Sequence, residues 1–148
     1  MTYRVRSADD RRAEIQARAT EMGIDETFVS TLVDTFYQRV RAHPELGPIF
    51  AGEVQDWDEH LPKMKAFWSS VALNSGRYSG KPVPAHQKLS GVSEDDFTTW
   101  LGLFEQTLIE IAPSPAVVPY FMERAERIAQ SLKLAMFSFP GLKDPRGV

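Results

Sequence analysis

Apolar residues recur along this chain at spacings of three and four, the period of an amphipathic helix, and no stretch alternates with the period of a strand. Phe28, Leu32, Phe36 and Val40 show this spacing in one of the clearest segments. The chain is therefore predicted to be all-α. Its 148 residues suffice for one sizeable core and leave little room for a second domain.

Cap and turn residues divide the chain into five long helical segments. The predicted helices run from about Asp9 to Met22, from the cap Asp25 to His43-Pro44, from the cap Asp56 to Asn74-Ser75-Gly76, from Ser93 to Pro113, and from about Ala116 to Phe137. Ser93 with Asp96 resembles a capping box. Residues 43–50 carry two prolines and a glycine, so we expect an irregular corner that aims Phe50 inward.

Charge and composition exclude several classes of function. The formal net charge is -3 and the basic residues form no stripe, which argues against nucleic acid as a partner. No apolar run is long enough to span a bilayer and the first residues lack the apolar segment of a secretory signal, so we expect no membrane association and a cytoplasmic location. Because the chain has no cysteine, metal chemistry is limited to histidine and carboxylate ligands.

Two histidines are candidates for a site, and each has a plainer explanation. His86 follows a turn-rich loop and lies on a short apolar segment with Leu89, so it is either the ligand of a flat cofactor or a solvated side chain. His60 stands one helical turn before Met64, and that face either roofs a cofactor or belongs to the edge of the core. His43, before Pro44, is interpreted as a surface or capping residue.

Aromatic residues leave the same two alternatives open. Tyr37 and Trp100 lie at helical spacing, where a buried aromatic usually directs its polar atom to a backbone carbonyl. Either residue can equally direct that atom toward a bound ligand.

Taken in order, five motifs resemble the group III truncated haemoglobins over roughly Ile24 to Leu132. They are Phe36-Tyr37 with Val40-Arg41, Leu46-Gly47-Pro48-Ile49-Phe50, Trp57-x-x-His60-x-x-x-Met64-x-x-Phe67-Trp68, Tyr78-x-Gly80-x-Pro82-x-x-x-His86-x-x-Leu89, and Trp100-Leu101-x-Leu103-Phe104-Glu105. The resemblance implies a truncated globin fold, a two-on-two helical sandwich around one haem b (iron protoporphyrin IX). With the helices and the tail read from the residues, we expect an N-terminal helical extension over 1–24, a truncated globin domain over 25–137 and a flexible tail over 138–148.

The resemblance further implies a role for each candidate residue. His86 is the expected iron ligand, and the ligand pocket is expected to comprise Tyr37, His60, Met64 and Trp100. The expected haem contacts are Phe50, Trp57, Lys63, Phe67, Tyr78 and Leu89. Plainer alternatives remain for three of these contacts, namely a solvated lysine for Lys63, a loop-anchoring hydroxyl for Tyr78 and core packing for Trp57. Because Pro62 follows His60 closely, it is expected to affect the orientation of that histidine.

The implied function is the binding of oxygen and other small haem ligands. Hydrogen-bond donors such as Tyr37 and Trp100 would slow the release of oxygen, which suits retention or redox chemistry better than delivery. A nitric oxide dioxygenase or a peroxidase using the same haem is the alternative, and turnover would need an external electron donor. The sequence neighbours of His86 supply no carboxylate of the kind that peroxidases place behind their histidine. A helical interaction module without cofactor is a further alternative.

Overall fold

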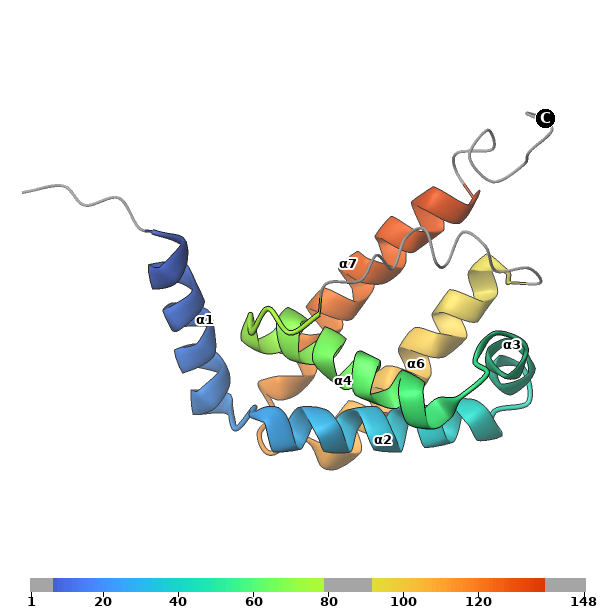
Figure 1. Ribbon diagram of the computed structural model, residues 1–148, viewed down its shortest axis with the longest axis horizontal. Helices are drawn as coiled ribbons and strands as arrows, with labels where there is room; N and C mark the ends of the chain where they lie inside the picture. Colours follow the sequence, from blue (N-terminus) through green and yellow to red (C-terminus); the bar gives the residue numbers. More distant parts are fainter. Residues whose placement is uncertain (1–6, 79–91, 138–148) are drawn as a thin grey trace, which may run out of the picture.

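The computed structural model describes residues 7–78 and 92–137, which form six helices (Figure 1). They are α1 (Ala8–Met22), α2 (Glu26–Ala42), α3 (Leu46–Glu53), α4 (Trp57–Leu73), α6 (Glu94–Ile111) and α7 (Val117–Phe137). These residues include no strand, and the all-α prediction is confirmed. His86, Leu89 and the predicted tail over 138–148 lie outside the described residues.

Two pairs of helices make the body of the fold. Helix α2 packs on α4, and α6 packs on α7. The pairs meet where α2 crosses α6 and α4 crosses α7, which is the two-on-two arrangement (Figure 1). Helix α1 contacts α4 and projects from the body, and Ala19 is its one buried residue. Within the described residues no helix is both long and apolar enough to cross a membrane.

Local cap chemistry explains where the helices begin and end. The Asp25 carboxylate accepts a hydrogen bond from the Phe28 N–H at 2.8 Å and so caps α2. Ser93 and Asp96 satisfy one another's backbone N–H groups at the start of α6, as the sequence predicts. Gly23 ends α1 with a φ of 91°, a left-handed conformation that favours glycine. The cap residues of the sequence therefore set these boundaries.

The region 43–50 differs from its prediction, because much of it is helical. Helix α3 starts at Leu46, and Pro48 is its third residue, where a helix has no partner for the N–H that proline lacks. The imidazole of His43 accepts hydrogen bonds from the N–H groups of Glu45 and Leu46, so His43 is the capping residue of this corner. The predicted irregular corner is thus reduced to the few residues between α2 and α3.

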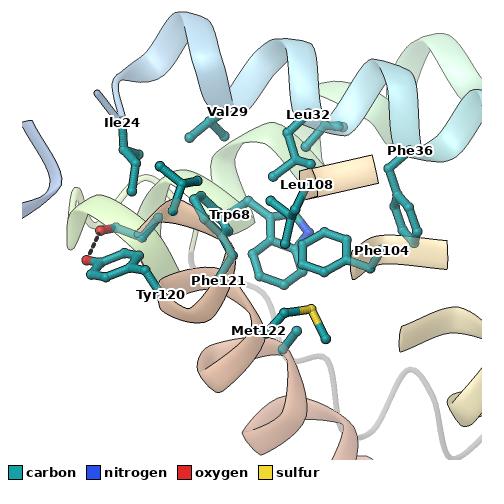
Figure 2. Packing of buried hydrophobic residues seen from close by; sticks show 14 of the residues in the cluster. Ile24, Val29, Leu32, Phe36, Trp68, Phe104, Leu108, Tyr120, Phe121 and Met122 are labelled. Atoms are coloured by element: carbon teal, nitrogen blue, oxygen red, sulfur yellow. Dashed lines mark hydrogen bonds between the residues drawn. The ribbon is translucent and has the colours of Figure 1, made fainter. Parts of the chain in front are cut away.

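A cluster of aromatic rings forms the centre of the core (Figure 2). Trp68 of α4 stacks on Phe104 of α6 with ring centroids 4.9 Å apart, and Trp100 stacks on the same Phe104 at 5.3 Å. Phe36 of α2 meets both Trp100 and Phe104 edge to face. Since each such pair adds about 0.5 to 1.5 kcal/mol beyond area burial, the cluster holds Trp100 firmly.

Candidate functional site

The described residues line a partly open cavity of about 380 Å³ between α2, α3, α4, α6 and α7. This volume lies in the usual range of sites for small molecules and cofactors. Most of the residues predicted from the sequence line it: Tyr37, Phe50, His60, Lys63, Met64, Phe67, Tyr78 and Trp100. The structure therefore brings together residues that are up to about sixty positions apart in the chain.

Tyr37 lies at one side of the cavity, surrounded by rings. Its ring centroid is 6.2 Å from His60, 6.0 Å from Phe50 and 6.0 Å from Trp57. Burial raises the pKa of the Tyr37 hydroxyl well above its ordinary value, because the phenolate is poorly solvated there. The hydroxyl therefore stays protonated at any physiological pH and can donate a hydrogen bond.

Helix α4 presents a row of side chains to the cavity. His60, Met64 and Phe67 follow one another at spacings of four and three, which places them on one helix face. The helix continues through Pro62, its sixth residue, where proline removes the N–H that would bond to the Asp58 carbonyl. Even so, the His60 ring remains on the cavity side, packed against Tyr37 and Trp57.

Trp100 of α6 also lines the cavity, together with residues that the sequence analysis did not single out. Phe97 of α6 and Ile128, Ala129 and Leu132 of α7 line the cavity. Their spacing is the ordinary period of a core-facing helix, so no sequence signal separates them from the residues buried in the interior. These side chains are apolar, and Asp96 at the start of α6 lines the cavity beside them.

Two predicted contacts lie at the edge of the cavity. Lys63 lines it with an exposed side chain, which also pairs with Glu59 at 3.3 Å. Tyr78 lines it as well and packs edge to face on Phe67, with ring centroids 5.1 Å apart. These two residues bring an ammonium group and a phenol hydroxyl to a largely apolar wall.

Trp57 differs from the other predicted haem contacts among the described residues, since it is not part of the cavity wall. It stacks on Phe50 at 6.4 Å and meets His60 at 5.5 Å, so it supports two residues that do line the cavity. The guanidinium of Arg41 lies 4.7 Å from the centre of its ring on another side. The position of Trp57 fits the packing alternative better than direct contact with a ligand.

A second hollow lies on the outer side of Tyr37, between α2 and α4. It is open to solvent and is lined by polar residues such as Asp34, Gln38 and Arg41, with Leu61 as an apolar contribution. Such a surface does not suit a flat apolar cofactor, because most of the surface of such a cofactor has to be buried away from water. The less open and largely apolar cavity between the five helices is therefore the candidate site.

Comparison with known proteins gives relatives of one kind. No protein-family model matches the chain. A group 3 truncated haemoglobin of Campylobacter jejuni is 30% identical over 122 residues, which are 80% of this chain and 95% of that protein. A group 2 truncated haemoglobin of Bacillus subtilis is 27% identical over 113 residues, or 74% of this chain and 83% of that protein.

A solved structure agrees with the sequence relatives. The crystal structure of the group III truncated haemoglobin from Campylobacter jejuni matches this fold with a TM-score of 0.73 at 29% sequence identity. The match covers 78% of this chain and 94% of that one. The chain therefore belongs to the group III truncated haemoglobins, and membership of this family implies a haem that binds small ligands.

Proposed function

We propose that the cavity holds one haem b and that the protein binds oxygen and other small ligands at the iron and retains them tightly. The observation that carries this proposal is the convergence of Tyr37, His60 and Trp100 on one largely apolar cavity. Tyr37 brings a hydroxyl and Trp100 an indole N–H to this wall, and both groups are hydrogen-bond donors. We infer that both donors serve a bound ligand.

The lining residues fit a haem. Phe50 and Phe67 offer aromatic contacts to an apolar macrocycle, and α7 adds Ile128 and Leu132. Lys63 and Tyr78 would bind the propionates, since an ammonium and a phenol hydroxyl both donate to carboxylates. We assign His86 as the axial ligand and Leu89 as a haem contact on the same segment, and Trp57 acts through Phe50.

The polar residues of the cavity would act on the ligand by hydrogen bonding. When bound, haem would supply an iron atom that binds one small ligand in the cavity. Tyr37 and Trp100 would donate hydrogen bonds to that ligand, and each well-aligned bond of this kind contributes about 1.5 to 3 kcal/mol. Such a bond slows ligand release by roughly ten- to a hundredfold.

His60 and Met64 complete the ligand side. His60 has two ring nitrogens and can donate or accept beside the ligand, while Met64 supplies an apolar ceiling that excludes water. Slow release favours retention over delivery. It also suits redox chemistry of the retained ligand, such as the reaction of oxygen with nitric oxide, with electrons from an external donor.

Optical spectra of the ferrous protein test this proposal. Without oxygen, we expect a five-coordinate spectrum, because the helix that carries Met64 and Phe67 keeps the His60 imidazole from the bonding distance of about 2 Å. Admitting oxygen should change the spectrum reversibly. The comparison variant is His60→Leu, which cannot ligate iron. Sharp six-coordinate low-spin bands in the unliganded wild type that vanish in His60→Leu would contradict an open ligand site.

A further inference from the structure

A closed ring of hydrogen bonds joins the start of α2 to the segment that follows α4. The Glu26 carboxylate accepts a hydrogen bond from the Arg77 guanidinium at 2.7 Å and another from the Ser69 hydroxyl at 2.7 Å. The hydroxyl oxygens of Ser69 and Ser75 are 2.7 Å apart, and the Arg77 backbone N–H donates to the Ser75 hydroxyl at 3.4 Å. We call these four residues the Glu26 ring.

The carboxylate fixes the direction of every bond in the Glu26 ring. An ionised carboxylate can only accept, so the single hydroxyl proton of Ser69 goes to Glu26. Ser75 must then donate its own proton to Ser69, which leaves the Ser75 oxygen free to accept from the Arg77 N–H. Arg77 therefore donates to Glu26 in two ways. Its guanidinium donates directly, and its backbone N–H donates through the hydroxyls of Ser75 and Ser69. Bonds aligned in one direction polarise and strengthen one another.

Ser69 is the buried member of the Glu26 ring, and its hydroxyl needs the hydrogen bonds that the ring provides. Ser69 is fully buried, and a buried hydroxyl without partners would be costly. Asn74 and Gly76 both adopt left-handed backbone conformations, with φ of 52° and 72°, and so turn the chain back after α4. The ring closes across this turn. The hydrogen bonds of the ring therefore stabilise the turn formed by Asn74 and Gly76 after α4.

The next residue after the Glu26 ring is Tyr78, which lines the cavity. Its backbone N–H donates to the Ser70 hydroxyl at 2.9 Å, and its ring packs on Phe67 at 5.1 Å. The Glu26 ring therefore fixes Arg77. The next residue, Tyr78, is held against α4 by its contacts with Ser70 and Phe67. Displacing Arg77 would loosen Tyr78.

We propose that the Glu26 ring is a positioning device for Tyr78 that keeps its side chain in the cavity wall and thereby slows the release of haem. The inference rests on the proposed function, because it assigns Tyr78 to the haem contact. We expect the binding of small ligands to stay unchanged, since none of the ring's hydrogen bonds involves Tyr37 or Trp100. Glu26 and Arg77 are positioning residues that act through Tyr78.

The test compares haem release from the wild type and from Glu26→Ala, with transfer of haem from the ferric protein to excess apomyoglobin. We expect release to be roughly three- to tenfold faster in the variant, a modest factor because the Glu26 and Arg77 side chains are each 51% exposed. Glu26→Gln, which keeps an acceptor for Ser69 but loses the charge, should fall between the two. Oxygen release from the ferrous protein should stay at the wild-type rate in both variants.

Asp34→Ala is the matched control. It removes the ion pair of Asp34 with Lys65 at 3.0 Å, which also joins α2 to α4 but lies away from Tyr78. Haem release from this variant should match the wild type. A general loosening of the α2 and α4 pair would instead accelerate release in Asp34→Ala as well, and would overturn the proposal.

Repeating the Glu26→Ala substitution in the Tyr78→Ala variant distinguishes an effect through Tyr78 from a general loss of protein stability. If the Glu26 ring acts through Tyr78, adding Glu26→Ala to Tyr78→Ala should change haem release little. An equal acceleration in both backgrounds, or a wild-type rate in Glu26→Ala, would overturn the inference. If the wild-type protein takes up no haem, the proposed function fails instead. Amide exchange at Tyr78 then still tests the ring, which requires faster exchange in Glu26→Ala and is overturned by an unchanged rate.

Discussion

Replacing His86 with glycine is expected to weaken haem binding by on the order of a hundredfold, because the variant loses the bond between the chain and the iron. Haem bound to the folded protein stabilises it by mass action, and a hundredfold loss of affinity removes up to about 2.7 kcal/mol of that stabilisation. Added imidazole should restore part of the wild-type spectrum by occupying the position of the missing ring. The measurement is a haem titration of both proteins, followed by thermal unfolding with and without haem.

The control for His86→Gly is His43→Gln. His43 accepts two backbone hydrogen bonds between α2 and α3 and is not among the described residues of the cavity wall. This variant should keep the wild-type haem affinity and spectrum. If His86→Gly retains the wild-type spectrum and affinity without imidazole, the assignment of the axial ligand is wrong.

Oxygen release is expected to be roughly ten- to a hundredfold faster in Tyr37→Phe and in Trp100→Phe, since each substitution removes one donor to the ligand. The double variant should deviate from additivity, because both donors would act on one ligand. Burial raises the pKa of Tyr37, so the hydroxyl is protonated throughout. The effect of Tyr37→Phe should therefore be the same from about pH 6 to about pH 9. Stopped-flow displacement of oxygen measures these rates.

Tyr120→Phe is the matched control for the loss of a phenol hydroxyl. The Tyr120 hydroxyl donates to the Ala72 carbonyl at 2.6 Å and is not among the described residues of the cavity wall (Figure 2). This variant should lose about 1 kcal/mol of unfolding free energy and keep the wild-type rate of oxygen release. Unchanged release in both Tyr37→Phe and Trp100→Phe would refute the proposed hydrogen bonding.

The sequence predicts those parts of the fold that depend on local chemistry. Asp25 and Ser93 begin helices where their side chains cap the backbone, and Gly23 ends one in a left-handed conformation. Helix α3 escaped prediction because a proline in a first turn looks like a proline in a loop. Helical spacing alone placed Tyr37 and Trp100 near the core without showing which cavity they meet.

The remainder of the site depends on contacts between distant segments. Ile128 and Leu132 repeat with the period of any core helix, and only the packing of α7 brings them to the cavity. The Glu26 ring joins residues up to 51 positions apart, and no spacing in the sequence indicates such a pairing. The roles of the predicted site residues, including His86, remain predictions that the variants above test.

Titration of haemin into the haem-free protein tests most directly whether this cavity is a haem site. If the cavity holds haem, we expect an intense Soret band that grows until one haem is bound per chain. Fluorescence of Trp68 and Trp100, which both line the cavity, should be quenched over the same range of added haem. Absorbance that matches free haemin at every ratio, or tryptophan emission that does not change as the haem binds, would contradict a haem in this cavity.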